Sequence, residues 1–313
     1  MKRLAGIVVI VLLARAATAC FWVTGTTYET KAVTVSGFGA ASRLRWYLKT
    51  DHQKDGLRME ADLRNSTNYN DRSDYAISLA YLGRNQEAVD ILQRLEQEQP
   101  GKYFVAANLG TALELAGNND EALRWIREGI RRNPNSHHGT EWLHAKILEA
   151  KIAQQKDPDY FKNHTVLDLD PKNVHAEVTV DGKRFSPKEV AQAIQGQLQE
   201  RLQFVKPPDQ PVASLLFDYA AVEAATHTLE SAKGLLKMAV EYGYPVARVE
   251  SQMKLYDKKI AWRKIKQYLW YCFLAAFGIG ALIVLYKRKF VGAVLQRPAN
   301  PENLKDQSGH EMR

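Results

Sequence analysis

The sequence predicts a mostly α-helical protein: a solenoid of helical hairpins with a small β-hairpin insert, followed by one C-terminal transmembrane helix. Three observations lead to this fold class. A pattern of small residues, turn glycines and prolines occurs twice at a fixed offset, a short stretch has the two-residue periodicity of strands, and one long uncharged run lies near the C-terminus. With 313 residues, 45% of them hydrophobic, the chain is long enough to bury a large core.

The repeated pattern lies within residues 74–134, and each copy predicts two helices. The first helix ends at a glycine, which adopts the left-handed conformation of a helix end at low cost, and the second ends before a proline. Small residues fall where the two helices of a pair cross, so the backbones can approach closely. The matching residues, 34 apart, are Ala76, Gly83, Glu87, Ala88 and Pro100 in the first copy and Gly110, Gly117, Glu121, Ala122 and Pro134 in the second.

These residues resemble the tetratricopeptide repeat (TPR) family, whose unit is a helical hairpin of about 34 residues. The second copy, with Asn108-Leu109-Gly110, is the better match; the first lacks the usual aromatic residue at its start. A strongly helical stretch at 139–155 follows, and we interpret it as a cap or the first half of a third repeat. The resemblance therefore covers residues 71–156 and implies an α-solenoid that binds proteins or peptides.

In this family the first helix of each hairpin lines the concave face. The resemblance implies a partner-binding groove formed by Asn70, Ser73, Ile77, Phe104, Asn108 and Thr111. Some relatives hold a peptide carboxylate with lysines and asparagines on these helices. Here Asn108 matches one asparagine, but the lysine positions hold Ser73 and Phe104, so we expect a groove of apolar and amide contacts. The alternative is that residues 21–70 of the same chain fill this groove.

The net charge of +8 does not indicate nucleic-acid binding, because the excess of basic groups is confined to the two ends of the chain. Residues 16–257 contain 29 Lys and Arg against 32 Asp and Glu, whereas residues 258–313 contain 11 against 3. We therefore expect no nucleic-acid partner.

Residues 1–19 have the three parts of a secretory signal peptide: a basic start, a short apolar run and an Ala-x-Ala end. Cys20 follows the expected cleavage site, and the sequence at this point also resembles a bacterial lipoprotein box, so Cys20 is a candidate for lipidation. The second cysteine, Cys272, lies in the apolar C-terminal run, so no disulfide within the chain is expected.

We expect residues 20–70 to form an N-terminal extracytoplasmic segment. Of the whole sequence, this stretch has the least regular pattern of secondary-structure signals. Residues 27–35 are rich in Thr and Val, and residues 42–47 could begin a helix that precedes the repeats.

Residues 157–211 are expected to form an insert with a β-hairpin and a helix. Asp181-Gly182 between β-type residues is a strong hairpin signal. Ser186-Pro187-Lys188-Glu189 has the residues of a capped helix start, with Ser as the N-cap and Glu completing a capping box.

Residues 212–257 predict a degenerate TPR-like helical hairpin. Ala220, Ala232 and Ala239 have a repeat-like spacing, and Tyr244-Pro245 stands in the closing position, although His227 replaces the turn glycine. The hairpin is out of phase with the first two copies, so the insert interrupts the array.

Residues 258–290 predict a basic juxtamembrane region and a transmembrane helix, with the span at 268–286. This run has no charge and has aromatic residues at both ends, as membrane interfaces favour. Basic clusters lie on both sides of the span, but the signal peptide commits the body to the outside. We therefore expect a single-pass protein of the cytoplasmic (inner) membrane, with the body in the periplasm or exterior and a disordered cytosolic tail at 291–313. Ala276 and Gly280 form a small-x-x-x-small pair that could support a homodimer.

One cluster has residue types suited to chemistry. His137, Glu141 and His144 are spaced by four and three, so on one helix they would form an imidazole and carboxylate set for zinc. A membrane-tethered metal-dependent hydrolase is therefore the alternative function. Gly139 interrupts the helix, and no second cluster supplies a catalytic base, so we expect no enzyme, no cofactor and no resident metal. The leading hypothesis is a membrane-anchored TPR-type scaffold or adaptor that binds a protein or peptide outside the cytoplasm.

Overall fold

The computed structural model describes residues 22–36, 39–171, 174 and 177–295. The expected signal peptide, Cys20 and the tail after residue 295 lie outside these residues. The chain divides into two compact units, Met1–Ile260 and Ala261–Arg313.

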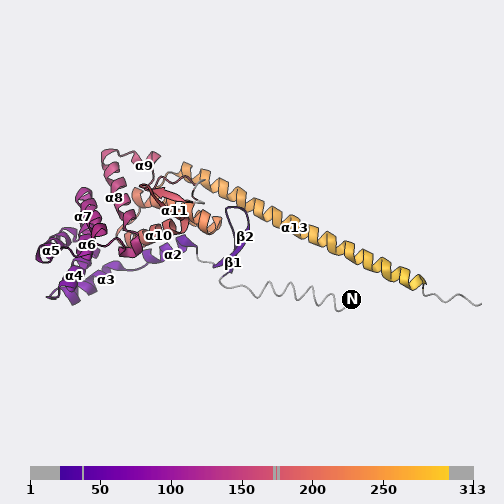
Figure 1. The fold of residues 1–313 in the computed structure, drawn as a ribbon, viewed down its shortest axis with the longest axis horizontal. Coiled ribbons are helices and arrows are strands. Elements are labelled where there is room, and N and C mark those ends of the chain that lie inside the picture. The colour runs from indigo at the N-terminus through magenta and orange to yellow at the C-terminus, as the bar shows by residue number, and fades with distance from the viewer. Residues whose placement is uncertain (1–21, 37–38, 172–173, 175–176, 296–313) are drawn as a thin grey trace, which may run out of the picture. The chain divides into compact units, whose positions relative to one another are not determined.

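The described chain is mostly helical, as predicted, with two short β-hairpins and one long apolar C-terminal helix (Figure 1). In chain order the elements are β1 (Trp22–Thr26), β2 (Ala32–Ser36), α2 (Ala40–Leu48), α3 (His52–Leu63), α4 (Tyr69–Tyr81), α5 (Asn85–Glu98), α6 (Tyr103–Leu115), α7 (Asn119–Arg132), the 3₁₀ segment η1 (Ser136–Gly139), α8 (Glu141–Lys156), α9 (Tyr160–Asn163), β3 (Val178–Val180), β4 (Lys183–Phe185), α10 (Pro187–Phe204), α11 (Gln210–Thr226), α12 (Leu229–Glu241) and α13 (Val246–Leu295).

Helices α4 to α7 form two consecutive hairpins whose helices lie side by side (Figure 1). The turns after α4 and α6 contain Gly83 and Gly117 at φ of 75° and 87°, the left-handed conformation that the repeat predicts. At the crossing of α6 and α7, a Cβ added to Gly110 would lie 2.6 Å from Cδ1 of Ile126. The glycine is therefore required for this close approach.

Helix α8 joins two hydrophobic clusters. Ala145 and Leu148 face the cluster of the repeat helices, whereas Leu143, Ile147 and Ala150 belong to a larger cluster built mainly by α2, α10, α11 and α12. The helix begins at Glu141, two residues later than the sequence suggests, because the residues before it form η1. Both faces of α8 are covered, so it is a packed partition between the clusters.

The larger cluster contains the insert helix α10 and the hairpin α11–α12. Helix α10 begins with the predicted capping box of Ser186 and Glu189, and its predicted apolar face is fully buried at Val190, Ile194, Leu198 and Leu202. Helix α11 is buried on nearly all sides and starts at Gln210.

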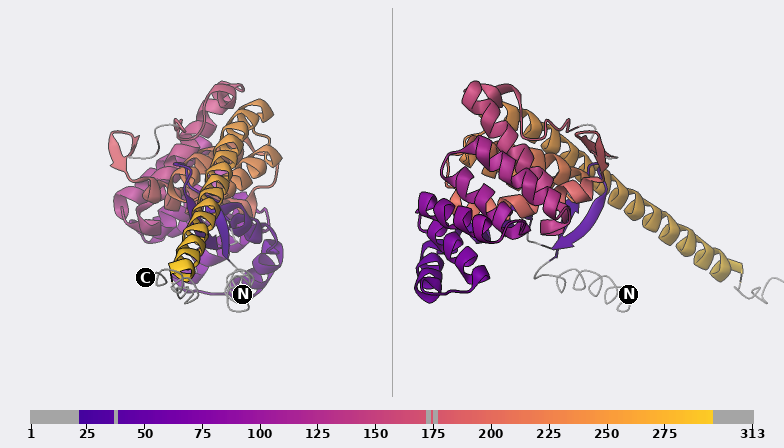
Figure 2. Two further views of the ribbon diagram at one scale, coloured as in Figure 1. Left: turned by 90° about the vertical axis from the view of Figure 1, so that its right-hand side faces the viewer. Right: turned by 60° about the vertical axis from the view of Figure 1, so that its left-hand side comes forward.

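Two antiparallel hairpins complete the first unit. The β3–β4 hairpin turns at Asp181-Gly182, where both residues have positive φ, and it projects at the edge of the helices (Figure 2). The β1–β2 hairpin is not recognisable from the sequence pattern. It is attached to α12 because Thr26 donates from its backbone N–H and its hydroxyl to the Glu230 carboxylate, at 2.8 and 2.7 Å.

Helix α13 contains the predicted span. The helical segment 246–288 is long and apolar enough to cross a membrane. Its most apolar 18-residue window has a mean hydropathy of 2.1, and none of this window is buried inside the protein. The helix continues to Leu295, so the first residues of the expected tail are helical.

Candidate functional site

The six predicted groove residues lie on α4 and α6, which are neighbours in the structure. Ser73 is buried and accepts a hydrogen bond of 3.0 Å from Nδ2 of Asn108. Phe104 is half-buried and packs edge to face against Tyr69, with ring centroids 6.2 Å apart. Asn70 is exposed. The structure therefore places part of the predicted set in the contact between the two helices and part at the surface.

Ile77 and Thr111 complete the set, and both are half-buried. The Thr111 hydroxyl donates to the backbone carbonyl of Ala107 in its own helix, at 3.2 Å. The α4 and α6 face thus offers a mixed apolar and polar surface at Asn70, Ile77, Phe104 and Thr111.

The C-terminal end of α4 is covered by two other parts of the chain, which both contact Tyr81. The Phe204 ring at the end of α10 stacks on Tyr81 with centroids 4.8 Å apart, and His52 of α3 stacks on the same tyrosine at 5.9 Å. The Tyr81 hydroxyl also donates to Gln203 at 2.9 Å. A cleft of about 460 Å³ remains here, lined in part by Asn85 and Leu115.

A buried ion network joins α6, α8 and α10 beside this cleft. The Glu114 carboxylate accepts from His144 Nε2 at 2.7 Å, from Lys151 Nζ at 2.9 Å and from Arg201 Nη1 at 2.6 Å. Burial alone would raise the pKa of Glu114, but the charges of Arg201 and Lys151 and the hydrogen bond of His144 outweigh it and hold the pKa well below its usual range. Glu114 is therefore a carboxylate that connects three helices.

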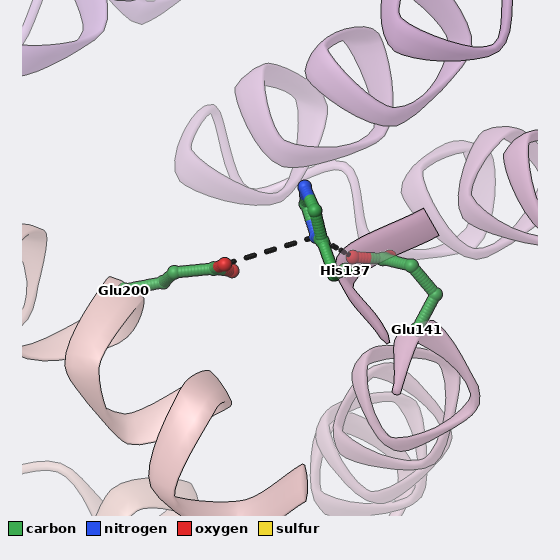
Figure 3. Close-up of side chains that lie close together, drawn as sticks. All are labelled: His137, Glu141 and Glu200. Carbon is green, nitrogen blue, oxygen red and sulfur yellow. Dashed lines mark hydrogen bonds and ion pairs between the residues drawn. The ribbon is translucent and has the colours of Figure 1, made fainter. Parts of the chain in front are cut away.

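A second charged cluster lies next to this network and is open to solvent. His137 lies between Glu141 and Glu200, with its Nδ1 hydrogen-bonded to Glu141 and 3.7 Å from Oε1 of Glu200 (Figure 3). His137 comes from η1, Glu141 from the first turn of α8, and Glu200 from α10. Their ligand atoms all lie within 4.8 Å of one another.

The pKa values in this cluster follow from its geometry. Burial acts to raise the pKa of Glu141, but the hydrogen bond with His137 and the nearby His144 imidazole lower it to about 2. The hydrogen bond to Glu141 raises the pKa of His137, against the opposing effect of burial. The contact between the His137 imidazole and the Glu141 carboxylate therefore favours the charged form of both groups.

Of the predicted metal set, His137 and Glu141 contact each other in the structure, whereas the His144 side chain points to Glu114 instead. Nε2 of His144 binds Glu114, and its Nδ1 is 3.6 Å from Glu141, so both ring nitrogens face carboxylates inside the protein. Within the described residues, the third ligand group that meets His137 and Glu141 is Glu200. Sequence spacing does not reveal Glu200, because it lies on the insert helix far along the chain.

No protein-family model matches this chain, and no curated protein sequence matches it.

Proposed function

We propose that this protein is a membrane-anchored scaffold or adaptor whose helical hairpins are TPR-type units that bind a protein or peptide partner. The observation that supports this best is the pairing of α4 and α6 in successive hairpins, which leaves Asn70, Ile77 and Phe104 wholly or partly accessible on one face. Such a surface combines apolar area with amide groups, which suit an extended peptide.

The buried ion network around Glu114 fixes helix α6, which carries part of this face, to α8 and α10. Glu114 on α6 is held by Arg201 of α10 and Lys151 of α8. Because Phe204 covers one end of the face, a bound peptide would lie along α4 and α6 and end near the cleft beside Tyr81. The insert helix would thereby set the length of peptide that fits.

The expected location follows from the candidate span in α13 and the N-terminal signal pattern. We propose a single-pass protein of the cytoplasmic membrane, with the hairpins outside and the C-terminus in the cytosol. Lipidation of Cys20 would add a second anchor. Ala276 and Gly280, one turn apart on α13, would form the contact of a homodimer.

Site-specific photocrosslinking in intact cells tests the binding proposal. A photoreactive amino acid at Asn70, exposed on α4, should give a discrete crosslinked product that mass spectrometry identifies as one protein. The same group at Gln93, exposed on α5, is the control and should not give that product. Equal crosslinking from both positions would reject the α4 and α6 face as the binding surface.

Protease protection tests the orientation. Protease added to spheroplasts should digest the hairpins and leave a tag placed after residue 313 on a short membrane-bound fragment. Loss of the tag with survival of the hairpins would reverse the topology.

A further inference from the structure

We propose that His137, Glu141 and Glu200 bind one divalent transition-metal ion, with Zn²⁺ as the best-matched ion, and that this ion links the cap helix α8 to the insert helix α10. The site goes beyond the scaffold function and does not depend on it. It also differs from the set expected from the sequence, because His144 is replaced by Glu200.

The three side chains have a geometry close to that of a zinc site. In a tetrahedral zinc site with bonds of about 2.0 Å, neighbouring ligand atoms are about 3.3 Å apart. Here His137 Nδ1 is hydrogen-bonded to Oε1 of Glu141 and lies 3.7 Å from Oε1 of Glu200, and all three ligand atoms are within 4.8 Å of one another. The same ring nitrogen faces both carboxylates (Figure 3), so an ion placed between them requires only small side-chain movements.

The donor atoms of the cluster also favour a transition metal. One imidazole and two carboxylates suit Zn²⁺ and similar ions, whereas Mg²⁺ prefers six oxygen ligands in octahedral geometry. The side chains of His137 and Glu200 are 48% and 49% exposed, while that of Glu141 is 5% exposed. Glu141 is thus the buried ligand of the cluster, and the side of His137 and Glu200 is open to solvent. An ion can enter from this side and keep bound water molecules there.

A further side chain, His144, lies behind the Glu141 ligand. Glu141 also faces Nδ1 of His144, and the other nitrogen of His144 binds Glu114. A carboxylate that ligates a metal is usually held in place by a further polar group of the protein. His144 would therefore position Glu141 rather than bind the ion.

Zinc titration of the full-length chain in detergent tests the proposal, with wild type, His137→Ala, His138→Ala and Glu200→Gln compared by competition with a chelating dye. His138 is the matched control: it is exposed, and like His137 it has a positive φ, 59° against 47°, so alanine changes the backbone preference equally at both positions. Glu200→Gln keeps the side-chain shape and removes the charge.

We expect one Zn²⁺ per chain in wild type and His138→Ala, and binding at least about tenfold weaker in His137→Ala and Glu200→Gln, the scale of loss when the surroundings of a metal ligand are altered. Excess Mg²⁺ should not displace the zinc. Zinc should also slow amide hydrogen exchange at the C-terminal end of α10 in wild type and not in Glu200→Gln. Absence of saturable zinc binding in wild type, or equal binding by the His137 and His138 variants, would overturn the proposal. If His137→Ala does not fold, the Glu200→Gln result decides alone.

Discussion

The Arg201 guanidinium of α10 donates to both oxygens of the Glu114 carboxylate of α6, at 2.6 and 3.1 Å, although the two residues are 87 positions apart. Their side chains are only 10% and 5% exposed. This contact joins the insert helix to the repeat helices. Loss of Glu114 would remove the carboxylate that both Arg201 contacts reach, whereas loss of Arg201 would leave Glu114 with Lys151 and His144.

We predict that Arg201→Met lowers the free energy of unfolding by about 3 kcal/mol, because the buried Glu114 carboxylate loses two charged hydrogen bonds. Lys151 and His144 still contact Glu114 and limit the loss. Chemical denaturation in detergent measures the effect. Arg131→Met is the control: Arg131 pairs with Glu128 at the surface with its side chain 72% exposed, so its loss should cost less than about 1 kcal/mol. Equal effects of the two substitutions would contradict the buried role of Arg201.

A second prediction concerns the helix crossing at Gly110. Gly110→Leu should destabilise the fold by about 1 to 3 kcal/mol or more, since even its Cβ would lie 2.6 Å from Cδ1 of Ile126 and 3.1 Å from the Ile126 nitrogen. Gly196 in the middle of α10 is the comparison, because an added Cβ there has no atom within 4 Å. Gly196→Leu should leave stability unchanged or raise it by up to about 1 kcal/mol, since glycine is a poor helix former. In thermal melts the midpoint should therefore fall for Gly110→Leu and should not fall for Gly196→Leu.

The features that the sequence predicts are those set by local pattern. The 34-residue offset identifies the crossing glycine because both copies lie in one continuous segment. The Asp181-Gly182 turn and the Ser186 cap depend on neighbouring residues only, and all are present in the structure. Local propensity and tertiary packing agree at these points, so pattern alone suffices.

The features that the sequence does not predict depend on tertiary contacts or on unusual turn chemistry. The β1–β2 hairpin has no glycine at its left-handed turn position, which is occupied by Thr30 at φ 63°, so the usual hairpin signal is missing. The direction of His144 depends on which face of α8 meets Glu114. The position of Glu200 beside His137 depends on how α10 packs, and no spacing in the chain encodes it.

A third prediction concerns pH. Burial raises the pKa of Asp218 in α11 to about 7, although Thr165 and the Leu167 backbone N–H donate to its carboxylate. The carboxyl of the unfolded chain has its ordinary pKa of 3.8, so between these two pKa values the native state binds the additional proton. The unfolding free energy should therefore fall as the pH rises from about 4 to about 7 and become level above this range.

Asp218→Asn provides the comparison for this pH dependence, since it removes the titrating group and keeps the size. Wild type should lose at least about 1.4 kcal/mol relative to the variant across the interval, the equivalent of one pKa unit. Denaturant titrations at a series of pH values measure the difference. A constant difference between the two proteins would show that Asp218 is ionised throughout and that its hydrogen bonds, not burial, determine its pKa.

The last prediction addresses how the α4 and α6 face binds. Phe104 is half-buried and contacts Tyr69 and Tyr103 through ring edges, so part of its ring remains available as an aromatic anchor. Phe104→Ala should weaken capture of the partner identified by crosslinking by about 2 kcal/mol or more, which is typical of a central anchor. Ile91→Ala is the control, because Ile91 is also half-buried against the same hydrophobic cluster but lies on α5, the second helix of its hairpin. Both variants should show a modest fall in melting temperature, and only Phe104→Ala should lose affinity in a binding titration. If the two variants bind alike and Phe104→Ala melts far lower, Phe104 serves the core, and the binding surface lies elsewhere.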